Sequence, residues 1–199
     1  GASPETMVKL VDGKLTTFPV AGTRPRGVND EQDKTLEKEL LADEKELAEH
    51  NMLVDLARND MGRIAKYGSV YLEDYMKIHR FSKVMHIAST VCGQIREDKD
   101  GCDTVSALLP AGTLSGAPKV RAMEIIDELE HGKRGLYTGS IGYLTLDGAC
   151  DFNIVIRTAL HKDGRYYLGV GGGITAESDL EFEYEETLQK AKAVLEALK

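Results

Sequence analysis

Two pairs of glutamates carry the clearest chemical signal in this 199-residue sequence. Glu46 and Glu49 lie three residues apart, and Glu183 and Glu186 repeat that spacing, with Lys190 four residues further on. Residues three apart share one face of a helix. Carboxylate oxygens suit Mg²⁺, which binds one or two carboxylates directly and keeps several waters. The two pairs therefore either converge on one divalent cation or form solvated acidic helix faces, and spacing alone favours the second interpretation.

Two glycine-rich segments are candidate anion sites. The segment Pro110–Pro118 leads into an expected helix, where backbone amides and the helix dipole favour an anion. The segment Gly169–Gly173 follows an expected strand, and consecutive glycines allow a ligand to approach the backbone closely. Neither is a P-loop or a dinucleotide fingerprint, because Gly116 is not followed by Lys and Ser or Thr, and Ile174 stands where the last glycine would be. A tight turn and a strand exit remain the alternatives.

Two single residues also stand out. His86 lies inside an expected strand, where a structural histidine is the more usual interpretation. Arg157 ends a mostly apolar strand, and a sequestered guanidinium needs an anion, which is either a glutamate partner or a substrate carboxylate. No Ser/His/Asp or Cys/His arrangement indicates nucleophilic catalysis.

The elements that position these residues are predicted from hydrophobic periodicity and turn signals. Strands are expected at 7–11, 14–20, 70–76, 83–94, 139–146, 151–159 and 166–169. Helices are expected from 31 to the late fifties, over 118–129, and after a capping box formed by Ser178 and Glu181. Residues 21–27 are expected to form a loop, and tight turns join adjacent strands. The pattern predicts an α+β fold with an antiparallel sheet and no internal boundary over residues 1–199.

Composition excludes several classes of protein. The net charge of −8, from 33 acidic and 25 basic residues, argues against a nucleic-acid partner. No apolar run approaches the roughly 20 residues of a membrane helix, so no membrane is expected. Three cysteines without a CxxC spacing predict reduced thiols rather than a disulfide framework or zinc site. With no signal-peptide pattern at the first residues, we expect a cytoplasmic protein.

Taken together, the segments resemble the chorismate-utilising enzyme family, and are closest to its anthranilate-forming members. The match covers nearly the whole chain in the same order, and nine motifs in register are far more specific than any one of them. They are SPE at 3–5, AGTRPRG at 21–27, KELAEHNMLVDLARND at 45–60, VMHIAS at 84–89, PAGTLSGAPK at 110–119, RGLYTGSIGY at 134–143, IRT at 156–158, GVGGGI at 169–174 and EYEETLQKA at 183–191.

The resemblance implies an antiparallel β-sandwich flanked by helices, with chorismate and Mg²⁺ in a cleft. It assigns the metal to four glutamates, namely Glu46, Glu49, Glu183 and Glu186. The backbone near Gly171 and Gly173, with Lys190, is then expected to help hold the ring carboxylate of chorismate. Tyr137 and Arg157 are expected to bind the enolpyruvyl carboxylate.

The resemblance also implies catalytic roles. Glu5 is expected to be the general acid that protonates the departing C4 hydroxyl, while His86 and Thr113 line the ring and His86 takes part in proton transfer. Ammonia, supplied by a glutamine amidotransferase subunit, adds at C2, and elimination of pyruvate leaves anthranilate for tryptophan biosynthesis. Aminodeoxychorismate synthases carry a nucleophilic lysine in a PIKGT motif, and Ala21 stands in that place here, which excludes that branch.

Several questions remain open. The residue that separates ammonia users from water users is expected upstream of Gly1, so an isochorismate- or salicylate-type synthase stays possible from the sequence. Family members have further strands before the SPE motif, so we expect a catalytic domain truncated at its N-terminal side. The isolated chain is then either weakly active or a non-catalytic fragment or interaction module. Association of identical chains is also left open.

Overall fold

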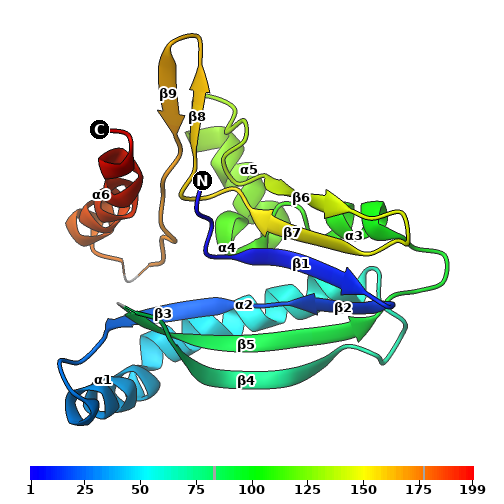
Figure 1. Cartoon of the computed structure of the whole chain (residues 1–199), viewed down its shortest axis with the longest axis horizontal. Helices are drawn as coiled ribbons and strands as arrows, with labels where there is room; N and C mark the ends of the chain where they lie inside the picture. The colour runs from blue at the N-terminus through cyan, green and yellow to red at the C-terminus, as the bar shows by residue number, and fades with distance from the viewer. Residues whose placement is uncertain (83, 177) are drawn as a thin grey trace. The chain divides into compact units, whose positions relative to one another are not determined.

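The structure is a computed structural model that describes residues 1–82, 84–176 and 178–199. Its strands, drawn in Figure 1, are β1 (Thr6–Val11), β2 (Lys14–Thr17), β3 (Val20–Pro25), β4 (Tyr71–Arg80), β5 (Val84–Gln94), β6 (Ser140–Leu144), β7 (Cys150–Ile154), β8 (Ala159–Lys162) and β9 (Arg165–Leu168). Its helices are α1 (Asp30–Ala42), α2 (Glu44–Gly62), α3 (Gly101–Leu108), α4 (Gly112–Ser115), α5 (Lys119–Leu129) and α6 (Leu180–Ala197).

The chain divides into two compact units, which are described separately. The first unit comprises Gly1–Met7, Leu109–Tyr143 and Phe152–Lys199, and the second unit comprises Val8–Leu108 and Leu144–Asp151. The hydrogen-bonded strand order is β3-β5-β2-β1-β7-β6, with β4 beside β5, and the division into units passes through β1 and β7. A separate hairpin pairs β8 with β9. The expected α+β class with an antiparallel sheet and flanking helices is confirmed.

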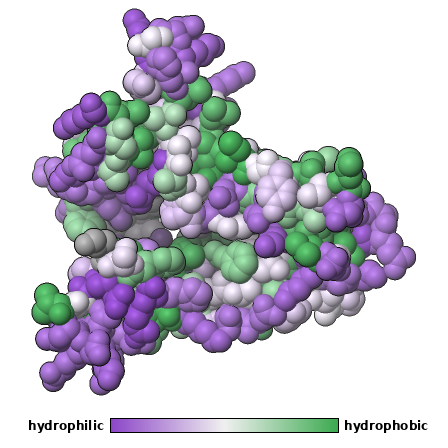
Figure 2. Space-filling view, in the orientation of Figure 1, coloured by the Kyte–Doolittle hydropathy of each residue, from purple (hydrophilic) through white to green (hydrophobic). Residues whose placement is uncertain are grey.

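The second unit is built on β5, which pairs with β4 along one edge and with β3 and then β2 along the other. Helix α2 packs against β3 and β5, as Figure 1 also shows. Leu40 of α1 joins Met85 and Ile87 of β5 in a cluster whose members are fully buried. Burying each such side chain contributes about 1.5–3 kcal/mol, so this cluster fixes α1 on the sheet. Hydrophilic residues gather over α1 on its outer side, at the lower left of Figure 2.

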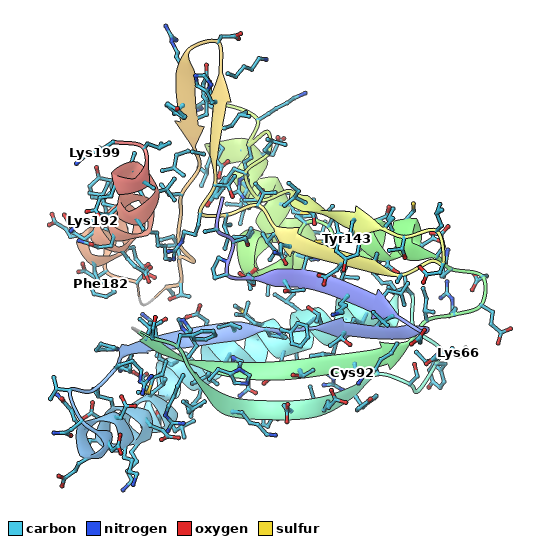
Figure 3. The ribbon with its side chains drawn as sticks, in the orientation of Figure 1. Lys66, Cys92, Tyr143, Phe182, Lys192 and Lys199 are labelled. Atoms are coloured by element: carbon cyan, nitrogen blue, oxygen red, sulfur yellow. The ribbon has the colours of Figure 1, made fainter. Side chains whose placement is uncertain are left out.

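The first unit has a smaller core. Ile154 and Val155 at the end of β7 are buried, whereas no residue of α5 is. Val120 and Leu129 of α5 are 72% and 71% exposed, and Phe182 of α6, labelled in Figure 3, is 66% exposed. These apolar side chains of α5 and α6 are therefore largely exposed.

Several elements differ from the sequence-based expectation. The strand expected at 14–20 ends at Thr17, and the strand expected at 151–159 ends at Ile154, with the separate strand β8 beginning at Ala159. The single helix expected from 31 to the late fifties is two helices, because Asp43 leaves the helical conformation and caps α2 by accepting hydrogen bonds from the amides of Lys45 and Glu46. The expected loop at 21–27 is mostly strand β3, which pairs with β5 through a register shift between Ala21 and Thr23. The periodicity of apolar residues reveals neither a helix break formed by a capping side chain nor a strand of irregular pairing.

The structure also bears on the cysteines and on membrane-spanning helices. All three cysteines are free thiols. Within the described ranges, no helix combines the length and apolar character needed to cross a membrane.

Candidate functional site

The second glutamate pair lies on the first two turns of α6, beside the glycine segment of the same unit. A Cβ atom on Gly172 would lie 3.4 Å from Oε2 of Glu183 and 3.4 Å from Oε2 of Glu186. The Lys190 ammonium lies 2.9 Å from Oε2 of Glu186 and 3.5 Å from the carbonyl oxygen of Gly171. The absence of a side chain at Gly172 thus lets two carboxylates and one ammonium approach the same stretch of backbone.

Helix α6 begins one residue later than the capping box predicted. Asp179, not Ser178, is the N-cap, and its side chain accepts from the amide of Phe182. The Ser178 hydroxyl instead donates to Oε1 of Glu183 at 2.8 Å. Glu183 is only 9% exposed, so this bond fixes a carboxylate that has little water around it.

Tyr137 lies against the same glycine segment. A Cβ atom on Gly169 would lie 2.5 Å from the Cβ of Tyr137, and one on Gly171 would lie 3.0 Å from its hydroxyl oxygen. The Arg134 guanidinium stands 5.8 Å from the centre of the tyrosine ring. Burial raises the pKa of Tyr137, so its hydroxyl is a hydrogen-bond donor at neutral pH. The structure therefore brings together five predicted residues, namely Tyr137, Gly171, Glu183, Glu186 and Lys190.

Gly173 and Arg157 complete the predicted anion-binding set in this unit. Nothing lies within 4 Å of a Cβ built on Gly173, so its backbone is accessible. Arg157 adopts a φ of 48°, a conformation that non-glycine residues seldom adopt, and its carbonyl accepts from the amide of Ala2. Its half-buried guanidinium makes no hydrogen bond or ion pair among the described residues. A half-buried guanidinium without such a partner is suited to bind an anionic ligand.

Glu5 and Thr113 also lie close together in the first unit. Burial raises the pKa of the Glu5 carboxyl, and the nearby Thr113 hydroxyl opposes that effect more weakly. No standard hydrogen bond joins the two groups, and the buried Thr113 Oγ1 has no partner among the described residues. A carboxyl group with a raised pKa keeps its proton to higher pH, which suits a general acid.

The first glutamate pair lies at the N-terminus of α2 in the second unit. Glu46 is in the first turn, and its Oε1 lies 3.3 Å from Nη1 of Arg24. A Cβ atom on Gly22 would lie 3.2 Å from its Oε2. Glu49 is on the exposed side of the helix and has an interaction partner of its own. This pair is therefore not simply a solvated acidic face, since Glu46 is half-buried against β3.

His86 of β5 is held by the same segment of β3. Its Nδ1 lies 3.0 Å from the carbonyl oxygen of Gly22 and 3.0 Å from the hydroxyl of Thr23. A carbonyl oxygen only accepts, so Nδ1 carries the hydrogen and Nε2 is the basic nitrogen of the neutral ring. The ring of Phe81 packs edge-on against it, with centroids 5.7 Å apart.

Two residues near Glu46 and His86 make strong interactions but were not singled out from the sequence. Arg24 bridges Glu46 and Asp43, and no local pattern in the sequence indicates it, because the register of β3 shifts just before this residue. His50 is fully buried on α2 and its Nε2 lies 2.7 Å from the hydroxyl of Ser89. Its position four residues after Glu46 places both on one helix face, which was a usable signal.

The Mg²⁺ assignment stays a prediction. Within the described residues, no three His, Cys, Asp or Glu side chains are grouped as a metal site. The donor set nevertheless fits the ion, because all four assigned side chains offer hard carboxylate oxygens and two of them converge beside Gly172.

Comparison with known proteins places this geometry in a family. The model of the chorismate binding enzyme family matches residues 1–196. The chain is 57% identical over 198 residues to anthranilate synthase component 1 of Mycolicibacterium smegmatis, covering 100% of this chain and 38% of that protein. The crystal structure of anthranilate synthase component I from Streptococcus pneumoniae matches with a TM-score of 0.89 and 48% identity, over 98% of this chain and 42% of that one.

A more distant structure shares the fold as well. The menaquinone-specific isochorismate synthase of Escherichia coli matches with a TM-score of 0.88 and 27% identity, over 100% of this chain and 45% of that one. The chain thus spans less than half the length of each of these three proteins. The motif-based resemblance is confirmed: the chain belongs to the chorismate binding enzyme family.

Proposed function

We propose that the protein carrying this sequence converts chorismate and ammonia into anthranilate and pyruvate in a Mg²⁺-dependent reaction, the first step of tryptophan biosynthesis. It acts in the cytoplasm, with ammonia supplied by a glutamine amidotransferase partner. Its similarity to proteins named anthranilate synthase component 1 supports this assignment. The observation that carries it is the convergence of Glu183, Glu186 and Lys190 beside the backbone of Gly172.

Glu46, Glu49, Glu183 and Glu186 are the proposed ligands of the metal. Bound Mg²⁺ would neutralise the charge of the substrate's ring carboxylate, an interaction that these carboxylates alone would oppose. Lys190 already lies beside Glu186 and the Gly171 carbonyl, so its ammonium is placed to contact the same carboxylate.

Arg157 and Tyr137 are the proposed partners of the enolpyruvyl carboxylate. The Arg157 guanidinium has no anionic partner among the described residues, and a bidentate arginine–carboxylate pair supplies both charge and orientation. The neutral Tyr137 hydroxyl adds one hydrogen-bond donor. Together they fix the substrate in one orientation, which lowers the entropic cost of reaching the transition state.

Glu5 is the proposed general acid and His86 the proposed base. Glu5 donates its proton to the C4 hydroxyl, which leaves as water while ammonia forms a bond to C2. Removal of the C2 proton then breaks the C3–O bond and makes the ring aromatic. The side chain leaves as enolpyruvate, which takes up a proton to become pyruvate. The basic Nε2 of His86 suits the removal of the C2 proton, because the contacts to Gly22 and Thr23 commit Nδ1 to donating its hydrogen.

The test is product identification with the full-length gene product that carries this sequence. With chorismate, ammonia and Mg²⁺ we expect anthranilate, seen by its fluorescence, and equimolar pyruvate. Chelation by EDTA and the variant Glu186→Gln should each abolish the signal. A surface variant, Glu97→Gln, removes an exposed pair with Lys66 and serves as the matched control.

A second candidate activity is an isochorismate- or salicylate-type synthase, which the likeness to the isochorismate synthase of Escherichia coli favours. It uses water in place of ammonia, so isochorismate or salicylate as the product would replace the first proposal. The isolated 199-residue chain is expected to turn over little chorismate, because it spans only 38–42% of the anthranilate synthase relatives. Efficient turnover by that chain would refute the fragment interpretation.

A further inference from the structure

We propose that Arg24 is a positioning residue for the metal ligand Glu46: it binds one carboxylate oxygen of Glu46 and ties that side chain to the N-cap of α2, so that the other oxygen is presented to the metal. This inference rests on the proposed metal-dependent function. It assigns a role to a residue of β3 that does not itself contact substrate or metal.

The irregular course of β3 places Arg24. Gly22 adopts a φ of 71°, and the pairing with β5 shifts register between Ala21 and Thr23. Beyond the shift, Arg24 stands opposite Met85 and its side chain reaches the start of α2. A non-glycine residue would be strained at position 22, so the shift and the direction of Arg24 both depend on this glycine.

The Arg24 guanidinium makes three contacts from two nitrogens. Nη2 lies 2.8 Å from Oδ2 of Asp43, while Nη1 lies 2.9 Å from the carbonyl oxygen of Thr23 and 3.3 Å from Oε1 of Glu46. The side chains of Arg24 and Glu46 are 26% and 24% exposed, so the pair is partly shielded from water. A planar guanidinium can hold two carboxylates at fixed angles, which an ammonium cannot do.

Asp43 gives this arrangement a rigid anchor. Its Oδ1 caps α2 by accepting from the amides of Lys45 and Glu46, and its Oδ2 accepts from Arg24. Backbone and side chain of Glu46 are therefore connected to the same cap.

The remaining oxygen of Glu46 is the one available to a metal. Oε2 makes no hydrogen bond among the described residues. It lies 3.2 Å from the position that a Cβ would occupy on Gly22, so a side chain there would displace it. Partners that hydrogen-bond to a metal ligand orient it, and removing them typically weakens metal affinity about 10–100-fold.

Metal affinity, and not activity alone, tests this proposal. In the full-length gene product we would titrate Mn²⁺, follow free ion by electron paramagnetic resonance, and measure the Mg²⁺ concentration for half-maximal turnover. Arg24→Gln is expected to raise both the Mn²⁺ dissociation constant and the half-maximal Mg²⁺ concentration about 10–100-fold. Asp43→Asn keeps a helix-capping side chain but replaces the ion pair with Arg24 by a weaker interaction. It should therefore raise these two metal concentrations by less than Arg24→Gln does. Arg24→Lys should restore affinity only in part.

Arg26→Gln is the matched control. It removes a comparable ion pair, with Asp33, two residues further along the same segment, and so should lower the melting temperature while leaving metal affinity unchanged. Unchanged or tighter metal binding in Arg24→Gln would overturn the positioning role and identify Arg24 as a competing counter-charge or a purely structural residue. Absence of metal binding by the unsubstituted protein would instead overturn the metal assignment itself, and this proposal with it.

Discussion

Replacing Gly169 with alanine tests whether Tyr137 is held in place by the glycine segment. The added Cβ would lie 2.5 Å from Cβ and 2.6 Å from Cδ2 of Tyr137, with Cγ closer still, whereas ordinary contacts are 3.4–4 Å. The overlap is therefore about 1 Å. Rotation of the ring cannot remove it, because the Tyr137 Cβ is fixed to the backbone, so one of the two segments must move.

Overpacking of this kind typically costs about 1–3 kcal/mol, which lowers stability without unfolding a domain. Its effect on catalysis should be larger, because a misplacement of about 1 Å can cost about 100-fold in rate. We expect Gly169→Ala in the full-length protein to lower kcat/KM for chorismate between about 10- and 100-fold, mainly through a higher KM.

Steady-state kinetics and thermal unfolding measure the two effects. Gly132→Ala is the matched control, since a Cβ there meets nothing within 4 Å, and it should leave both values nearly unchanged. Tyr137→Ala removes the ring atoms in the overlap, so the double variant should lose less stability than the sum of the single variants. A KM for Gly169→Ala equal to that of the unsubstituted protein, or strictly additive losses of stability, would refute this account.

Three further predictions follow from single groups. Glu5→Gln should abolish turnover yet raise the free energy of unfolding at neutral pH. Because the pKa of Glu5 is raised in the folded protein, the stabilising contribution of the protonated carboxyl is present below its unfolded pKa of 4.5 and is lost as pH rises through its folded pKa. Equal stability of the variant at neutral pH would contradict this. Arg157→Gln should raise the KM for chorismate about 10–100-fold with a smaller effect on metal affinity, because the lost contact is a charge-assisted one of about 1.5–3 kcal/mol; a normal KM would exclude a substrate contact. Burial lowers the pKa of His50 from 6.5 to about 4, so in EDTA the free energy of unfolding should fall by about 3 kcal/mol as pH drops from 7 through 4. That part of the pH dependence should be absent in His50→Asn, as denaturant titrations at several pH values would show.

Much of the fold followed from local patterns. Tight turns were expected between adjacent strands, and those at Asp12-Gly13 and Asp163-Gly164 form with positive φ at all four residues. The break at Asp43 was missed because apolar periodicity continues across it, whereas the break itself depends on one side chain bonding two amides. From the sequence alone, an aspartate that caps a helix cannot be told from an aspartate inside a helix, because the difference lies in the backbone conformation.

The candidate site was predictable to a similar degree. Spacing placed Glu183 and Glu186 on one helix face, and the structure adds that both meet the Gly172 backbone. The contact of Arg24 with Glu46 joins residues 22 apart in sequence through a register shift, so no local pattern encodes it. The roles of Glu5 and Thr113 came from the family resemblance, and their proximity is a tertiary property.

The central proposal is that carboxylates of both glutamate pairs hold one divalent cation. Crystals of the full-length protein with Mn²⁺ and chorismate, measured at the manganese absorption edge, test it most directly. We predict one anomalous peak per chain, within about 2.0–2.3 Å of carboxylate oxygens from α2 and from α6 or of waters bound to them. A peak bound by only one of the two helices, or none at these glutamates, would contradict the proposal.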